Sequence, residues 1–445
     1  MISQMQRFLR HFLLMTLASC LLFFCFLLLV KTCQARTPFD DKPINYSTAT
    51  VTDDISKLQK DIDSGKVTLK YDEKHGYLKS VLKHLGISHS SQTLVFSKTS
   101  FQRPYISSKK PRAVYFSDNV YIGWVQNGDV MEVSSSDPQL GAIFYTLEQK
   151  KTEKPKFKRQ VESCMLCHSS SFGHRVPAHV VRSIYPNYSG HPIGGSYTYR
   201  TTDKSLLKER FGGWYVSGKH GKKTHMGNMM FRNSAEIDKP NYQKSSNVTN
   251  LTKLFDTKPY LTSQSDIVAL YVLTHQATMH NKITAVNYQV RKALYEEKQL
   301  RKKEKRDEKK KQHTPLTQLR INQAAEELVK YMLFAEAAPL PSRIEGKPEF
   351  QKEFAAKAKR DKQGRSLRDF DLKNRLFKYP CSFLIYTESF DALPDPLKKV
   401  IYRRLHEILT GKDQSKMFQK LSKADRQAIY EILLETKPEF EKNKE

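Results

Sequence analysis

The chain carries the stretch Cys164-Met165-Leu166-Cys167-His168, which has the pattern C-x-x-C-H. Its two cysteines lie about one helical turn apart, and the histidine follows directly. In this arrangement both thiols can reach the vinyl groups on one edge of a porphyrin, and the imidazole can bind the iron. We therefore expect one covalently attached haem c, held by Cys164 and Cys167, with His168 as the fifth ligand of the iron.

Other interpretations of this stretch are a thioredoxin-like redox pair, half of a zinc site, or chance. A redox pair would stand in a βαβ pattern, which the flanking sequence does not show. Zinc would need further ligands, but the chain has neither a second C-x-x-C nor an H-x-x-x-H pattern. With 6 Cys and 14 His among 445 residues, a chance match is rare. Haem attachment is thus the favoured interpretation.

The start of the chain looks like an export signal. Arg7 and Arg10 precede a charge-free apolar run over residues 12–30, and Cys33-Gln34-Ala35 resembles a small-x-Ala cleavage site. At 19 residues, the apolar run is also long enough to span a bilayer. We expect residues 1–35 to be a signal peptide cleaved after Ala35, with a retained inner-membrane anchor as the alternative. Either way, the rest of the chain is expected in the periplasm or cell envelope.

The formal charge of +29 makes nucleic acid, an anionic membrane or an acidic protein conceivable partners. Nucleic acid is not expected, because haem is attached to C-x-x-C-H outside the bacterial cytoplasm. An acidic redox partner steered by the basic surface stays open. The densest charge block, residues 301–311, is interpreted as a solvated helix or linker.

The sequence predicts an α+β chain that is mainly α. A small antiparallel β meander should precede a loop-rich, cytochrome c-like haem site, and an α-helical region should follow it. A long helix should begin at the capping pattern Ser263-Gln264-Ser265-Asp266, run to about Gln312 and end at Pro315. The expected organisation is a linker with a short helix (36–91), the meander and haem region (92–262), and the helical region (263–445) with a Lys-rich segment (297–312).

The sixth ligand of the iron decides whether such a haem transfers electrons or binds small molecules. Met226 is the first candidate, because it lies in a Gly-rich loop about sixty residues after the attachment site. His225 is the second candidate, and Met229 or Met230 follow. His275 and His280 lie five residues apart on the long helix, so they point in different directions and are expected to be structural.

Further residues could line the haem pocket. Arginines can bind the haem propionates through bidentate contacts, and the candidates are Arg182, Arg200 and Arg210. His179 could form part of the pocket wall. Trp214 is expected to stack against the porphyrin or to pack in the core. Cys381 stands among apolar residues and is predicted to be a buried thiol.

The chain resembles a group of exported, largely uncharacterised bacterial proteins with a cytochrome c domain. The resemblance runs from about residue 110 to the C-terminus. It is carried by the segments Ser163–Ser170, Val176–Ser183, Arg210–Gly218, His225–Asn228, His275–Asn281 and Tyr379–Tyr386. It implies haem binding and electron transfer, carried here by Cys164, Cys167 and His168, and implies no catalytic activity or substrate.

Three functions follow as hypotheses. The first is an exported mono-haem cytochrome-like protein that transfers electrons. The second is a haem enzyme or small-molecule sensor with an open iron site, of peroxidase-like type, which the large size of the chain favours. The third is a structural protein of the cell envelope in which haem is a minor module. The sequence shows no Ser-His-Asp order, P-loop or dinucleotide-binding glycine pattern above chance.

Overall fold

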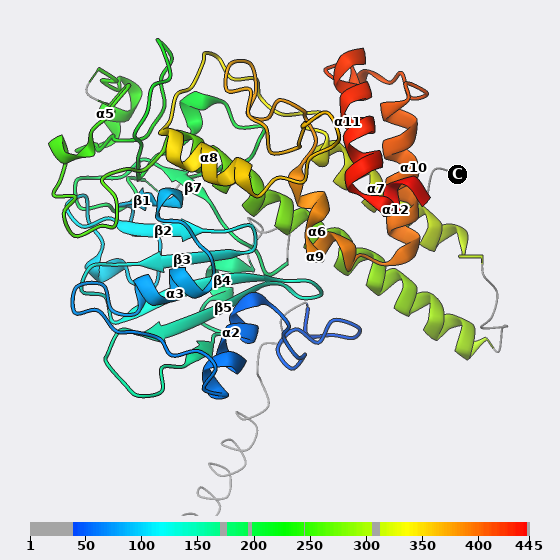
Figure 1. Ribbon diagram of the computed structural model, residues 1–445, viewed down its shortest axis with the longest axis horizontal. Coiled ribbons are helices and arrows are strands. Elements are labelled where there is room, and N and C mark those ends of the chain that lie inside the picture. The colour runs from blue at the N-terminus through cyan, green and yellow to red at the C-terminus, as the bar shows by residue number, and fades with distance from the viewer. Residues whose placement is uncertain (1–38, 170–175, 195–197, 244, 305–311, 443–445) are drawn as a thin grey trace, which may run out of the picture. The chain divides into compact units, whose positions relative to one another are not determined.

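The computed structural model describes residues 39–169, 176–194, 198–243, 245–304 and 312–442 (Figure 1). The predicted export signal, residues 1–35, lies outside the described residues. Of the described residues, 39–48 form a unit separate from those that follow from Ala49 onward. Within the described ranges, no helix is both long enough and apolar enough to cross a membrane.

A seven-stranded antiparallel sheet forms one half of the larger unit, in the order β6-β5-β4-β3-β2-β1-β9 (Figure 1). The predicted turn at Asn127-Gly128 joins two of its strands, and Asn127 adopts a φ of 57°, which asparagine tolerates in tight turns. The strands are β1 (Thr93–Val95), β2 (Arg112–Phe116), β3 (Val120–Trp124), β4 (Val130–Asp137), β5 (Gly141–Glu148), β6 (Phe157–Arg159) and β9 (Trp214–Tyr215).

The α+β class is confirmed, with 38% helix and 14% strand, but the sheet is larger than the predicted small meander. Its two outermost strands are three and two residues long, so neither shows a readable alternation of apolar and polar residues. Strand β9 is contributed by the chain after the C-x-x-C-H stretch and pairs with β1 through Leu94 and Val95. The strands of this sheet therefore come from the chain both before and after the candidate site.

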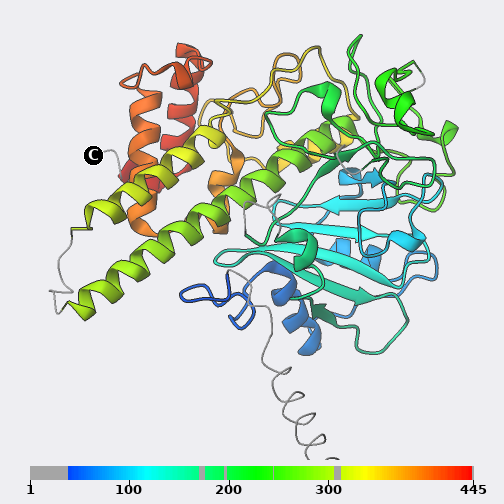
Figure 2. The ribbon, with the colours of Figure 1, turned by 180° about the vertical axis from the view of Figure 1, so that it is seen from behind.

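Different parts of the chain cover the two faces of the sheet (Figures 1 and 2). Helix α2 (Asp54–Asp63) lies on one face, where Tyr145 of β5 donates a 2.6 Å hydrogen bond to its N-cap residue, Asp53. The opposite face carries Tyr121 of β3, whose ring packs against His179. Helix α3 (Leu78–His84) confirms the short helix predicted near residues 77–85. The second face is the one that meets the candidate site.

The predicted long helix is α6 (Ile267–Lys303), and its N-cap is Asp266 as expected. The Asp266 carboxylate accepts hydrogen bonds from the backbone N–H groups of Val268 (2.8 Å) and Ala269 (3.1 Å). The predicted end near Gln312 was wrong. Helix α6 ends at Lys303, and Pro315 begins the next helix rather than ending this one, since proline fits the first helical position after the cap Thr314.

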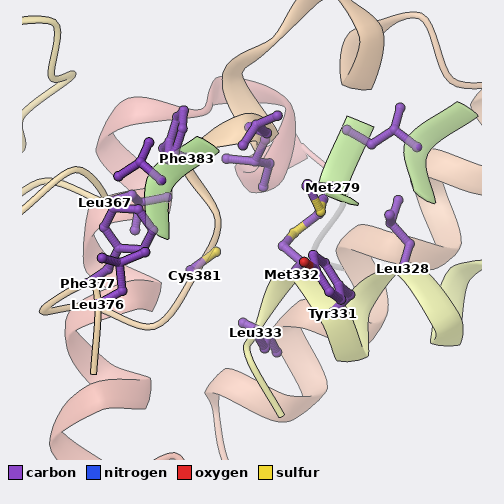
Figure 3. Packing of buried hydrophobic residues seen from close by; sticks show 14 of the residues in the cluster. Met279, Leu328, Tyr331, Met332, Leu333, Leu367, Leu376, Phe377, Cys381 and Phe383 are labelled. Carbon is purple, nitrogen blue, oxygen red and sulfur yellow. The ribbon is translucent and has the colours of Figure 1, made fainter. Parts of the chain in front are cut away.

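The C-terminal region is helical, as predicted, and packs around an apolar core that contains Cys381 (Figure 3). Cys381 is fully buried beside Phe377 and Phe383, and burial raises the pKa of its thiol to about 12. The prediction of a buried thiol is confirmed. The helices are α7 (Pro315–Met332), α8 (Pro348–Ala356), α9 (Glu388–Asp391), α10 (Asp395–Leu409), α11 (Lys423–Thr436) and α12 (Pro438–Lys442).

Candidate functional site

The C-x-x-C-H stretch forms a single helical turn, α4 (Met165–His168). The carbonyl oxygen of Cys164 accepts hydrogen bonds from the backbone N–H groups of Cys167 (3.2 Å) and His168 (3.1 Å). The turn leaves Cys164 half-buried and Cys167 exposed, and Leu166 between them is 84% exposed. The expected one-turn spacing of the thiols is therefore present, at the surface of the protein.

One ring nitrogen of His168 is fixed by the backbone. Its Nδ1 lies 2.8 Å from the carbonyl oxygen of Ala178, and the Ala178 N–H donates back to the His168 carbonyl at 3.0 Å. A carbonyl oxygen only accepts hydrogen bonds, so Nδ1 carries the proton and Nε2 keeps its lone pair. Among the described residues Nε2 has no hydrogen-bond partner. This is the tautomer that a histidine needs to bind a metal through Nε2.

The surroundings of His168 also favour its neutral form. Its ring packs against Phe144 of β5, with the ring centroids 4.4 Å apart. Burial lowers the pKa of His168, and the positive charges of Arg112 and Arg182 lower it further. A neutral imidazole with an available nitrogen is what a transition-metal ion requires.

A second layer of hydrogen bonds holds the carbonyl that orients His168. The residue after Ala178 is His179, whose N–H donates to Asn281 Oδ1 at 2.8 Å and whose carbonyl accepts from Asn281 Nδ2 at 2.7 Å. The His179 ring lies between two serines of β4, with Nδ1 2.6 Å from Ser134 Oγ and Nε2 2.9 Å from Ser136 Oγ. We call Ala178, His179 and Asn281 the backbone anchor. It ties the site to both the sheet and α6.

Two charged residues of the sheet lie beside the turn, and no sequence pattern indicated them. Arg112 of β2 and Glu132 of β4 form an ion pair at 2.7 Å, and the N–H of Phe101 donates to the other Glu132 oxygen at 3.0 Å. Burial raises the pKa of the Cys164 thiol to about 11, with a smaller contribution from the Glu132 carboxylate. Both residues come from strands far upstream of the motif, so only the sheet register could reveal them.

The two favoured candidates for the sixth ligand, Met226 and His225, are buried and have hydrogen-bond partners of their own. The Met226 side chain is 2% exposed, and its sulfur accepts a hydrogen bond from Ser183 Oγ at 3.5 Å. Ser183 belongs to β7 (Arg182–Ile184), and neighbouring strand residues point to opposite sides. Met226 therefore lies across β7 from the side chain of Arg182, whose charge acts on His168.

His225, the second candidate, is also engaged with its own neighbours. Its Nδ1 accepts from the Gly227 N–H at 3.0 Å, and its ring lies 4.5 Å from that of His220. Burial lowers the pKa of His225 to about 3. The prediction that His225 or Met226 binds the iron therefore stays a prediction. Met229, a further candidate for the sixth ligand, is also buried. It belongs to a small apolar cluster with Phe231 that is separate from the main core.

The predicted pocket residues are distributed around β7. Trp214 is 6% exposed, belongs to the main apolar core and donates from Nε1 to the carbonyl of Arg182 at 2.8 Å. Arg200, in β8 (Thr198–Arg200), pairs with Arg182 across the two strands. Arg210 is buried, donates from Nε to the Ser205 carbonyl at 3.0 Å and stacks on a tyrosine of α6. Among these residues, Arg182 acts on His168, because its positive charge lowers the pKa of the imidazole.

The histidines of α6 are structural, as predicted, but one of them forms an arrangement that the sequence did not reveal. His275 Nδ1 lies 2.7 Å from Asp203 Oδ2, and Nε2 lies 2.8 Å from Ser382 Oγ. This has the hydrogen-bond order of a Ser-His-Asp triad. His275 and Ser382 are both 0% exposed, so no substrate reaches the hydroxyl. His280 Nε2 instead lies 2.7 Å from the carbonyl of Asp118.

No group of three or more His, Cys, Asp or Glu side chains that could hold a metal ion occurs in the described part of the chain. Comparison with protein-family models, with curated proteins and with solved structures found no match. The chemistry of the C-x-x-C-H turn and its surroundings is therefore the basis for a functional assignment.

Proposed function

We propose that this chain is an exported mono-haem c-type cytochrome-like protein that transfers electrons through its haem. The observation that carries the proposal is the state of His168. Its Nδ1 proton is held by the Ala178 carbonyl, and Nε2 is left available one residue after a thiol pair. The basic, apolar start of the chain supports export to the periplasm or cell envelope. The charge of +29 fits an acidic protein as the redox partner.

The residues present fit a covalent haem. Cys164 and Cys167 would hold the porphyrin by thioether bonds, and His168 would bind the iron, which supplies one-electron redox chemistry when present. The Ala178 carbonyl fixes the tautomer of His168 and makes Nε2 more basic. Phe144 restricts rotation of the imidazole by packing on its face.

The test is a pyridine-haemochrome spectrum and an intact mass of the exported full-length protein. The wild type should show one haem c and the mass of one added macrocycle. Cys164→Ala with Cys167→Ala should lose both signals. Cys381→Ala is the matched control, because this cysteine is buried in the apolar core of the helical region and should leave haem attachment unchanged. A colourless wild type of unmodified mass, made with haem-attachment machinery present, would refute the proposal.

A haem enzyme or sensor with an open iron site is the second candidate. The observation that favours it is the placement of Met226 across β7, with its sulfur already bonded to Ser183. Carbon monoxide binding to the reduced protein distinguishes the two functions. An open site binds it readily, and Met226→Ala leaves the spectrum unchanged. If Met226 is the sixth ligand, the wild type resists carbon monoxide and Met226→Ala becomes high-spin and binds it.

A further inference from the structure

The hairpin of helices α6 and α7 carries several exposed leucines at the end where the two helices meet. In Figures 1 and 2 the last turns of α6 and the first turns of α7 extend away from the sheet. Leu300 of α6 is 57% exposed, and Leu316 and Leu319 of α7 are 59% and 51% exposed. A single exposed leucine is common on a protein surface, whereas a group of them marks an interaction site.

An ion pair between the helices shows that these leucines are neighbours. Glu296 of α6 pairs with Arg320 of α7. Leu300 lies four residues after Glu296, and Leu316 lies four residues before Arg320. Residues four apart share one face of a helix, so both leucines lie one turn beyond the ion pair on the same side of the hairpin. Leu319 lies three residues after Leu316 and extends this group, which we call the leucine patch.

Buried Glu297 holds this end of the hairpin together. One of its carboxylate oxygens accepts from the N–H of Thr314, the cap of α7, and from Arg301 Nη2, both at 2.8 Å. The other oxygen lies 2.9 Å from His313 Nδ1. These contacts fix the start of α7 against α6, so the leucine patch stands on an ordered support.

The last turns of α6 also carry unbalanced positive charge. Three exposed lysines here, which we call the tip lysines, form no ion pair within the described ranges: Lys298, Lys302 and Lys303. Glu296 and Glu297 are each paired with an arginine, which leaves Glu304 as the remaining acid. Lys303 lies three residues after Leu300 and therefore on the same face of α6. The end of the hairpin thus combines apolar side chains with excess positive charge.

This combination matches the surface of an anionic membrane. Leucines that enter the boundary between headgroups and acyl chains, together with lysines at the level of the headgroups, are typical of interfacial binding. A protein partner fits less well, because a stable interface buries about 800 Å² on each partner, far more than three half-exposed leucines supply. A second copy of this chain would carry the same charge of +29 and would be repelled.

We propose that the end of the α6–α7 hairpin binds an anionic phospholipid surface. The leucine patch inserts among the lipids, and the tip lysines lie at the headgroups. This contact is separate from the apolar run at residues 12–30 and does not depend on the haem. It would hold the proposed electron-transfer protein at a membrane surface.

The first measurement is co-sedimentation of the exported protein with vesicles of phosphatidylcholine or of an equal mixture with phosphatidylglycerol. The wild type should prefer the anionic vesicles. Replacing the tip lysines by glutamine should weaken this binding about fivefold for each lysine removed. The matched control removes the same charge from three exposed lysines of the connector before β6, by Lys150→Gln, Lys151→Gln and Lys154→Gln. The control should leave the binding unchanged.

The second measurement is local to the hairpin, whether or not residues 12–30 also bind lipid. Leu316→Trp places an indole in the leucine patch, while the two natural tryptophans, Trp124 and Trp214, are buried. The emission of the new indole should shift to shorter wavelength when anionic vesicles are added, because the ring leaves water. Leu206→Trp is the matched control, since Leu206 lies outside the hairpin and is 47% exposed. Its emission should not shift.

The outcomes separate the possible occupants of this surface. A preference for anionic vesicles that is lost with the tip lysines, together with the shifted emission, supports the inference. Equal losses in both lysine variants, or an unshifted emission at residue 316, overturn it and leave the haem function standing. Self-association of the wild type that Leu316→Ser abolishes would overturn it in favour of a second copy. Binding to polyglutamate but not to vesicles would overturn it in favour of an acidic protein.

Discussion

His168 and His275 are two buried or half-buried imidazoles with opposite bonding. His168 uses one nitrogen on the Ala178 carbonyl and keeps the other available. His275 uses both nitrogens, one on Asp203 and one on Ser382, inside a fully enclosed aromatic core. The ring of Phe334 stacks on His275 at 4.6 Å. The difference separates a histidine that can react from one that stabilises the fold.

The comparison also shows why residue types alone are a poor guide to a site. Asp203, His275 and Ser382 have the hydrogen-bond order of a hydrolase triad, but their burial excludes a substrate. His168 has fewer polar partners, but it is only half-buried, its tautomer is fixed and two thiols are its neighbours in sequence. Accessibility and a vacant hydrogen-bonding position distinguish the two cases.

The largest expected effect on the free energy of unfolding comes from replacing His275. His275→Ala would leave the Asp203 carboxylate and the Ser382 hydroxyl without their partner, so we expect a loss of about 3 kcal/mol in the free energy of unfolding. His168→Ala in the haem-free protein should cost less, about 1–2 kcal/mol, because it removes one hydrogen bond and one ring contact and not two buried hydrogen bonds. Urea unfolding of both variants measures the difference. Equal losses would contradict the division into structural and reactive histidines.

A somewhat smaller effect is expected for the backbone anchor. Asn281→Leu removes both hydrogen bonds to the backbone of His179 and should cost about 2–3 kcal/mol. Asn287→Leu is the matched control, because Asn287 is also buried on α6 but makes one long bond, 3.4 Å, to Pro138. The control should cost less than half as much in the same urea titration. A control as damaging as Asn281→Leu would rule out a special role for the anchor.

His280 sharpens the comparison through its pH dependence. It resembles His168 in bonding a carbonyl through one nitrogen, but it is 2% exposed, and burial lowers its pKa to about 4. Between pH 6.5 and 4 the unfolded chain binds a proton that the folded protein does not, so stability falls as the pH falls. The titration of His280 should therefore lower the free energy of unfolding by on the order of 2 kcal/mol between pH 6.5 and 5.

His280→Gln keeps a donor for the Asp118 carbonyl and removes the titrating ring. The stability difference between wild type and variant should therefore shrink on acidification, and urea unfolding at several pH values measures it. A difference that is constant from pH 7 to 5 would show that His280 has the same pKa in the folded and the unfolded protein, so that burial does not lower its pKa.

The smallest effect concerns the thiols of the haem-free protein. Iodoacetamide at pH 8 should modify half-buried Cys164 more slowly than exposed Cys167, because burial raises the pKa of Cys164 to about 11. Glu132→Gln should speed the labelling of Cys164 about two- to threefold by removing a nearby negative charge. Glu148→Gln, in an exposed ion pair with Lys158, is the control. Peptide mass spectrometry follows both sites, and an unchanged Cys164 rate in Glu132→Gln would contradict the expected influence of that carboxylate.

The sequence by itself determined the local features of this protein. The one-turn spacing of the thiols, the cap of α6 at Asp266 and the burial of Cys381 depend on residues next to one another in the chain. Such features follow from the geometry of a helical turn and from local apolar content, which a single sequence displays.

Only the tertiary structure decided what surrounds the thiols. It brought Ala178, Arg112 and Glu132 to the C-x-x-C-H turn, placed Met226 across β7 and joined Asp203 to Ser382 through His275. These contacts depend on sheet register and on the packing of α6, which join residues tens to hundreds of positions apart. A local pattern does not encode that register, because shifting a strand by one residue changes every side chain on a face.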